Sequence, residues 1–383
     1  GIIKAFSVDM DAQTFNQIKN DHLVNKISID QKVRAVLDVS AGEIGANETW
    51  AKTDANGFPI TGIGKRIAII DTGVDYTNPD LGGCFGPTCK VIGGYDFVNN
   101  DDNPMDDHGH GTHVAATAAG NGAASNGQLL TGIAPGAKIL AYKVLGADGG
   151  GYGSWIVAAI QAATDPNGDG DTSDHVDVAS MSIGGSSADP DGEVDVAVDI
   201  STGFGVVHTI SAGNSGPSLE TINSPGSART AITVAAACKD AEVGVSNLCP
   251  TPIATFSSRG PLIWNGMDLH KPDIAAPGVH ICAARWDSAF PSAPTCFDNQ
   301  HTRISGTSMA APHMAGAAAL VLQAYPNFTP AEVKQLLKSS ASPLPGVTEN
   351  DQVTGRVNLA AAAHYGPRPY PGRQRCWPGS CAW

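Results

Sequence analysis

Ser308 has the surroundings of either a helix cap or a catalytic nucleophile. It lies in RISGTSMAAPHMAGAAALVLQAY (303–325), where residues 309–325 read as a buried helix. A serine at such a start commonly caps the helix, because its hydroxyl accepts an unpaired backbone N–H. However, Pro312 removes the N–H that would bind the Ser308 carbonyl, and Gly306 permits close backbone approach. These two features also favour an exposed serine with free N–H groups around it, which would react if a base lay nearby.

Three histidines in DDHGHGTHVAATAAG (106–120) supply a candidate base. His110 and His113 are three residues apart on a predicted helix, and glycines on both sides of His110 leave its imidazole uncrowded. Such a histidine can accept a proton near pH 7. The alternative is a zinc site that also uses His108. The stretch lacks the glutamate of an HExxH motif, so we favour the base.

Asp71 closes the apolar stretch KRIAIID (65–71), which reads as a strand. In a parallel sheet, functional groups gather at the carboxyl ends of the strands, and Asp71 has that position. The alternative interpretation is that Asp71 caps a turn with Thr72 and Gly73.

The chain order of these three residues narrows the chemistry. The order Asp71, His110, Ser308 is that of subtilisin, whereas chymotrypsin and the α/β-hydrolases have different orders. Ala310 stands where a G-x-S-x-G elbow has its last glycine, which disfavours an α/β-hydrolase. The sequence resembles the subtilase family of serine proteases over about residues 66–325. The segments that carry the resemblance are AIIDTGVD (68–75), HGHGTHVAATAAG (108–120), SMSIGG (180–185), SAGNSG (211–216), KPDIAAPG (271–278) and GTSMAAPHMAG (306–316).

The resemblance implies a serine endopeptidase with Asp71, His110 and Ser308 as its triad. In that chemistry Ser308 attacks the peptide carbonyl, His110 takes its proton, and Asp71 stabilises the imidazolium, giving an acyl-enzyme intermediate. The resemblance also makes Asn214 an oxyanion donor together with the Ser308 N–H, although Asn-Ser-Gly is also ordinary turn chemistry. A catalytically silent binding protein and a histidine metallohydrolase are the rival classes.

The resemblance also implies where a protein or peptide substrate lies. The substrate backbone would lie as a strand against residues 182–185, and its P1 side chain would enter a pocket between that segment and residues 211–214. Neither segment contains a charge, so we expect broad specificity with an apolar or aromatic P1 side chain. Asn223 would lie at the pocket floor and make it shallower. The substrate-binding candidates are Ser182, Ile183, Gly184, Gly185, Ala212, Gly213 and Asn223.

The alternation of predicted strands and helices along the chain predicts an α/β fold. From residue 36 apolar strands alternate with helices, which indicates a mostly parallel sheet with helices on both faces. Residues 1–35 read as strand, helix and strand, and they resemble the second half of a subtilase propeptide, an inhibitor and folding chaperone. We therefore expect a partial propeptide at 1–35, a catalytic domain at 36–383, and maturation cleavage within 33–43.

Composition bounds the partners and the compartment. The 383 residues carry a net charge of −14, which argues against a nucleic-acid partner, and no apolar run is long enough to span a membrane. An even number of cysteines without a CxxC motif favours disulfides, and hence a secreted protein, over zinc or free thiols in a cytosolic enzyme. We also expect a monomer. The expected couples are Cys84 with Cys89, Cys238 with Cys249, Cys282 with Cys296, and Cys376 with Cys381.

Two acid-rich loops suggest structural calcium. We expect no organic cofactor. The loop before the histidines offers hard oxygen ligands, of which the candidates are Asp96, Asp101 and Asp106, and the family resemblance implies a further ligand in the NPDL segment, Asp80. The stretch TDPNGDGDTSDHVDV (164–178) matches the first half of an EF-hand loop. Val176 in place of the closing glutamate excludes a true EF-hand, and a solvated acidic turn is the alternative for both loops. The candidates in this second loop are Asp165, Asn167, Asp169, Asp171 and Asp174.

Overall fold

The computed structural model divides the chain into two units, residues 1–36 and 37–383. The described residues are 14, 17, 19, 21, 40–125, 130–286, 296, 298–348, 350–351 and 354–363. Every element described below belongs to the second unit. The predicted propeptide fold of residues 1–35 lies almost wholly outside the described residues.

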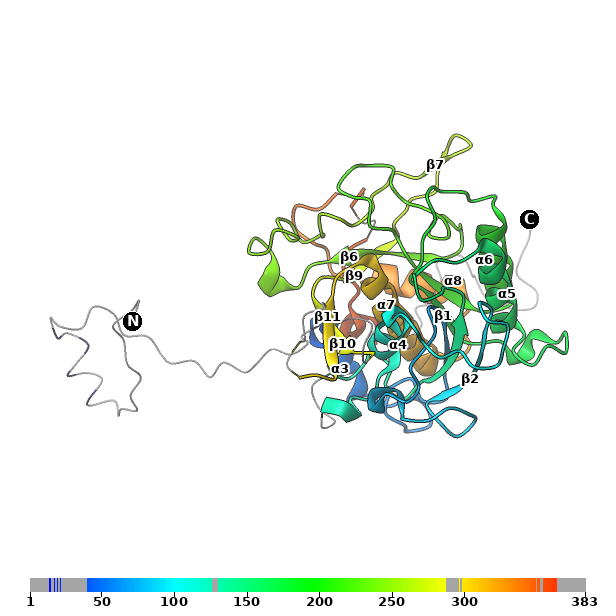
Figure 1. Cartoon of the computed structure of the whole chain (residues 1–383). Coiled ribbons are helices and arrows are strands. Elements are labelled where there is room, and N and C mark those ends of the chain that lie inside the picture. The colour runs from blue at the N-terminus through cyan, green and yellow to red at the C-terminus, as the bar shows by residue number, and fades with distance from the viewer. Residues whose placement is uncertain are drawn as a thin grey trace, which may run out of the picture. The chain divides into compact units, whose positions relative to one another are not determined.

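A seven-stranded parallel sheet forms the centre of the second unit (Figure 1). Its strands read as almost continuous apolar runs, because helices cover both faces and each strand must bury both sides. In spatial order the strands are β2 (Val91–Asp96), β3 (Lys138–Lys143), β1 (Arg66–Asp71), β4 (Val178–Met181), β5 (Val207–Ser211), β6 (Ile232–Ala237) and β9 (Ile274–Pro277). The predicted mostly parallel α/β fold is confirmed.

The two faces of β1 show how the helices are divided between the layers. Ile67 and Ile69 pack in one core with α4 (His110–Ala119) and α7 (Thr307–Ala324). The alternating residues Ala68 and Ile70 pack in a second core on the opposite face. That face is covered by α5 (Gly153–Thr164) and α6 (Glu193–Gly203), which lie side by side in Figure 1.

Smaller elements surround this frame. Two antiparallel pairs join β10 (Ile281–Ala284) to β11 (His301–Ile304) and β7 (Ile263–Trp264) to β8 (Met267–Asp268). The remaining helices are α2 (Ser40–Glu43), α3 (Ala46–Trp50), α8 (Pro330–Ser339) and α9 (Leu359–Ala362), with 3-10 turns η1 (Pro79–Leu81), η2 (Ala123–Ser125), η3 (Thr172–Asp174) and η4 (Asp240–Glu242).

Three of the four expected cysteine couples are disulfides in the structure: Cys84–Cys89, Cys238–Cys249 and Cys282–Cys296. The fourth couple, Cys376 and Cys381, lies outside the described residues. Within the described part of the chain, no helix is both long and apolar enough to cross a membrane.

Candidate active site

The carboxylate of Asp71 and the imidazole of His110 form a short hydrogen bond. Asp71 is the last residue of β1 and is fully buried, while His110 is the first residue of α4. His110 Nδ1 lies 2.7 Å from Asp71 Oδ1, and the same oxygen accepts the Thr72 N–H at 2.7 Å. Gly109 precedes the helix with φ of 99°, a backbone conformation that glycine adopts without strain. The strand end and the helix start thus present the two side chains to each other.

The environment of His110 favours its protonated form. Burial alone would disfavour the imidazolium, but the negative charge of Asp71 and the hydrogen bond to it outweigh that effect, and Asp106 adds to it. Together they raise the pKa of His110 above its ordinary value of 6.5. The opposite holds for His113, where burial is the main cause that lowers the pKa to about 3. His113 is therefore a neutral core residue, and of the two helix histidines it is His110 that is placed to exchange a proton near neutral pH.

Ser308 lies in the first turn of α7, and the helix-cap interpretation of this residue is wrong. Gly306 occupies the N-cap position, and no side chain caps the helix there. Because Pro312 has no N–H, the Ser308 carbonyl is available to another donor, and it accepts the Ser182 hydroxyl at 2.7 Å. The Ser308 hydroxyl donates in turn to the Ser182 carbonyl at 3.3 Å.

The sheet register brings these contacts to one place. Ile70 of β1 is paired with Met181 of β4, so the next residue of each segment, Asp71 and Ser182, lies at the same carboxyl edge of the sheet. His110 is held on Asp71 and Ser308 on Ser182. The predicted acid and base are thus in contact at the end of one strand, and the predicted hydroxyl is bonded at the end of the neighbouring strand.

Asn214, just after β5, is fixed by the start of α7. Its Oδ1 accepts the Thr307 N–H at 2.9 Å and the Thr307 hydroxyl at 3.0 Å, which fixes the direction of its amide group. Asn214 Nδ2 and the Ser308 backbone nitrogen each lie 3.6 Å from the point where a Cβ on Gly306 would stand. Two nitrogen donors thus border one small space beside the Ser308 hydroxyl, which is an arrangement suited to a developing oxyanion.

Asn223 lies between the two segments predicted to form the substrate pocket. Its Nδ2 donates to the Gly185 carbonyl at 2.7 Å. A Cβ on Gly184 would lie 3.0 Å from the Asn223 amide atoms, and a Cβ on Gly213 would lie 2.9 Å from its Oδ1. The side chain therefore occupies space between residues 184–185 and Gly213.

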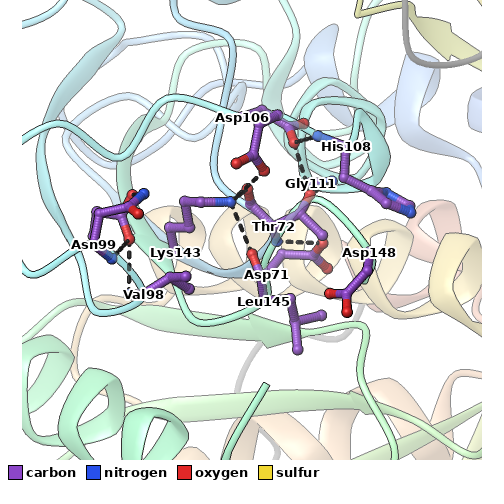
Figure 2. A network of polar contacts seen from close by, with 12 residues as sticks. Asp71, Thr72, Val98, Asn99, Asp106, His108, Gly111, Lys143, Leu145 and Asp148 are labelled. Carbon is purple, nitrogen blue, oxygen red and sulfur yellow. Dashed lines mark hydrogen bonds and ion pairs between the residues drawn. The ribbon is translucent and has the colours of Figure 1, made fainter. Parts of the chain in front are cut away.

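Asp106, expected as a metal ligand, uses its oxygens to stabilise the base loop in the structure. It is buried, and its two oxygens accept the hydroxyl of Thr72 together with backbone or hydroxyl groups of His108, Gly109 and Thr112. Burial raises its pKa, which these hydrogen bonds only partly offset. Figure 2 shows Asp106 and Thr72 in the same network of polar contacts as Asp71. A fully hydrogen-bonded carboxylate has no lone pair left for a cation.

The other calcium candidates near this loop do not converge either. Both Asp80 oxygens are bonded, to the Ala124 N–H at 2.8 Å and to His301 Nε2 at 2.7 Å. Asp96 accepts from the residues that immediately follow it, and Asp101 is exposed and accepts the Asn103 N–H. Among the described residues, no group of three or more His, Cys, Asp or Glu side chains is placed to hold a metal ion.

The second acidic loop curls around Asp165. The two Asp165 oxygens accept the N–H groups of Gly168 and Gly170, at 2.9 and 2.8 Å. Asn167 Nδ2 lies 3.1 Å from Asp169 Oδ2, which brings these two exposed side chains together. Asp171 points its Oδ1 at the Ser173 N–H, and Asp174 belongs to the following 3-10 turn.

Several residues that support the site were not predicted from the sequence. Thr72 and Thr307 accept or donate beside Asp71 and Asn214, and Lys143 donates to the Thr72 carbonyl from the end of β3. The one available signal was position, because Thr72 directly follows a strand, Lys143 ends one, and Thr307 begins a helix. Nothing in such a position distinguishes a supporting residue from an ordinary turn residue.

The comparisons with known proteins agree with this geometry. The model of the subtilase family matches residues 62–363. The chain is 37% identical to serine protease AprX of Bacillus subtilis (strain 168) over 342 residues, which are 88% of this chain and 73% of that protein. It is 35% identical to a subtilisin of Bacillus sp. (strain TA39), covering 92% of this chain and 80% of the relative. Among solved structures, sphericase aligns with a TM-score of 0.65 at 29% identity over 86% of this chain and 99% of its own.

The raised pKa of His110 predicts the acid limb of the pH profile. Only the neutral imidazole can take the serine proton, so kcat/KM should rise with pH as His110 loses its proton. Because the folded pKa lies above 6.5, the midpoint of this limb should also lie above 6.5. Initial rates on a neutral peptide substrate between pH 5 and 9 measure it, and a midpoint below 6.5 would contradict the arrangement described.

Proposed function

The chain belongs to the subtilase family and is a serine endopeptidase, and we propose that Asp71, His110 and Ser308 carry its reaction. The observation that supports these roles most is the Asp71–His110 hydrogen bond, formed beside the strand end on which Ser308 is held. Neither rival class requires this combination. A metallohydrolase needs converging ligands, and the described residues contain no such group.

The proposed reaction proceeds through an acyl-enzyme. Ser308 Oγ attacks the peptide carbonyl carbon while His110 Nε2 takes the hydroxyl proton, and Asp71 stabilises the imidazolium that forms. Asn214 Nδ2 and the Ser308 N–H donate to the oxyanion. The intermediate collapses as His110 gives its proton to the leaving amine. Water, deprotonated by His110, then attacks the acyl carbon, and His110 returns the proton to Ser308 Oγ as the ester bond breaks and the acid product leaves.

Replacing Ser308 by Ala tests the nucleophile. The hydroxyl is the attacking group, so we expect kcat to fall by about a million-fold, the loss known for subtilisin itself. A fluorophosphonate that labels active serines should modify the wild type and leave Ser308→Ala unlabelled. Residual activity above about 1% of wild type, or wild-type activity that a zinc chelator abolishes, would show that another group carries the reaction.

We propose that the enzyme prefers an apolar P1 side chain of limited size. The pocket segments, residues 182–185 and 211–214, contain no charged residue. Asn223 fills space between Gly184 and Gly213, so the proposed P1 pocket has less depth for the ring of an aromatic P1 side chain. Small and medium apolar side chains should therefore be cleaved better than aromatic ones.

Asn223→Gly tests this limit. Removing the side chain should raise kcat/KM for a substrate with Phe at P1 by about tenfold relative to one with Ala at P1, because extra pocket volume is worth 1–3 kcal/mol for an apolar group. The matched control is Asn265→Gly in the β7–β8 turn, which should leave the ratio unchanged. If the two variants give the same Phe-to-Ala ratio, Asn223 does not limit the pocket.

We propose that the protein is secreted and matures by loss of the N-terminal segment. The three disulfides are typical of an oxidising compartment. Ser40 and Ile44 are buried, and the Ser40 hydroxyl lies 2.8 Å from His313 Nε2 on α7. Cleavage should therefore leave Ser40 on the mature enzyme. Within the expected region of residues 33–43, the cleaved bond should precede Ser40. N-terminal sequencing of the mature protein would overturn this if it began after Ser40.

We propose one structural calcium ion in the loop of residues 165–171. Asn167, Asp169 and Asp171 are exposed on this short loop, and no Lys or Arg within residues 164–178 offsets its acidic side chains. In the structure the Asp165, Asn167 and Asp169 oxygens accept N–H groups of the loop itself and do not converge, so calcium would take the place of these donors. Calcium takes several such oxygens at 2.3–2.6 Å, and it would hold this loop between α5 and β4. No catalytic step depends on it.

Asp169→Ala tests the calcium loop. A hundredfold excess of calcium over Kd stabilises the wild type by about 2.7 kcal/mol if the unfolded chain does not bind it, and the variant should lose most of this gain. Melting temperatures with calcium and with a chelator measure the difference. The control is Asp101→Ala in the other acidic loop, which should keep the full calcium response. An equal response in wild type and Asp169→Ala would place the ion elsewhere.

A further inference from the structure

Lys143 is a fully buried lysine at the end of the strand next to Asp71. It is the last residue of β3, and its side chain has no solvent exposure. The ammonium group makes three contacts: it donates to the Thr72 carbonyl at 2.8 Å, to the Leu145 carbonyl at 2.8 Å and to Asp107 Oδ1 at 2.5 Å. Figure 2 shows this nitrogen beside Thr72. All three of its N–H groups are used, which is what a buried ammonium requires.

The position of Lys143 is set by the sheet. Lys143 and Asp71 are register partners in adjacent parallel strands, so their side chains leave the sheet on the same side. The Asp71 carbonyl also accepts the N–H groups of Val144 and Leu145, at 2.8 and 3.2 Å. The segment after Lys143 is thus bonded to the residue that orients His110.

The contacts of Lys143 join the two parts of the chain that carry the acid and the base. Thr72 follows Asp71 directly, and Asp107 comes three residues before His110. One ammonium therefore connects the end of β1 with the loop that starts α4. Removing it would leave two buried carbonyl groups and the loop carboxylate without their donor.

We propose that Lys143 is a positioning residue of the protease reaction, which fixes Asp71 against His110 and adds a positive charge behind the pair. The proposal rests on the triad roles given above. Lys143 does not touch the substrate, and its effect passes through Thr72 and Asp107. This role is absent from the mechanism as derived from Asp71, His110, Ser308 and Asn214 alone.

The charge of Lys143 has a predictable effect on His110. A fixed cation disfavours the imidazolium, whereas Asp107 favours it. The other charged or titratable groups around His110 are Asp71 at the end of β1, Asp106 and His108 in the loop, and His113 one turn further along α4. None of these residues is itself replaced in the Lys143 and Asp107 variants.

Two substitutions with opposite charge effects test the proposal. Lys143→Met should move the acid limb of kcat/KM upward by about half a pH unit, because a positive charge near the imidazolium is lost. It should also lower kcat by about 10- to 100-fold, because the pair is no longer held in place, with KM within about twofold. Asp107→Asn keeps an oxygen acceptor for Lys143 but removes a negative charge, so it should move the limb downward by a few tenths of a pH unit.

A second buried lysine serves as the control, because it separates a specific effect on the catalytic pair from the general cost of losing a buried ion pair. Lys271 is also buried and ion-paired, with Asp273 at 2.8 Å, away from the triad. Lys271→Met should lower the melting temperature. The midpoint of the acid limb of kcat/KM and the kcat of the folded enzyme should stay at wild-type values. Titration of active serines with a fluorophosphonate normalises every rate to folded enzyme.

Opposite limb shifts in Lys143→Met and Asp107→Asn, with the limb unmoved in Lys271→Met, would support the proposal. If Lys143→Met fails to fold, Asp107→Asn decides, because its side chain is 44% exposed and its replacement should be tolerated. The role of Lys143 would be overturned if the acid-limb midpoints of folded Lys143→Met and Asp107→Asn equalled that of the wild type, or if both midpoints moved in the same direction. A wild type without serine labelling would instead overturn the proposed triad.

Discussion

The burial of one carboxylate constrains the whole site. Asp71 ends an apolar strand inside a two-faced sheet and has no exposed surface. A buried charge is tolerated only when donors and an opposite charge compensate it. His110 and the Thr72 N–H supply donors to one oxygen, and the strand beside it ends in a buried lysine. The loops around Asp71 are therefore arranged to bring charge and N–H groups to a point that the solvent does not reach.

Close backbone packing makes this arrangement possible. A Cβ on Gly111 would overlap the carbonyl oxygen of Gly73, so the first turn of α4 rests directly on the loop after Asp71. On the other side, the missing N–H of Pro312 frees the Ser308 carbonyl for the Ser182 hydroxyl. The absence of a side chain at Gly111 lets α4 contact the loop after Asp71. The absence of an N–H at Pro312 lets α7 bond the end of β4. Rigidity of this kind is what orients reacting groups before substrate arrives.

The sequence predicted the parts of the molecule that repeat a regular pattern. Continuous apolar strands and alternating helices predicted the parallel sheet, a strand end located Asp71, and the family resemblance located Ser182. Strand β2 was not predicted, because two glycines interrupt VIGGYD, and β9 was not, because it is only four residues long and ends in a proline. Asp80 and Asp106 looked like calcium ligands because acidity alone is visible in a sequence. Their actual partners, His301 and Thr72, are distant along the chain and become visible only in three dimensions.

The Nδ1 proton of His110 gives the most direct measurement of the central claim, that the buried Asp71 side chain holds this imidazole. Proton NMR of the mature enzyme, with ¹⁵N-labelled histidine to assign the signal, would observe it. A hydrogen bond of 2.7 Å to a carboxylate predicts a far-downfield resonance, protected from exchange on both sides of the His110 titration and lost in Asp71→Ala. A rapidly exchanging proton at an ordinary imidazole shift, unchanged in Asp71→Ala, would contradict the account.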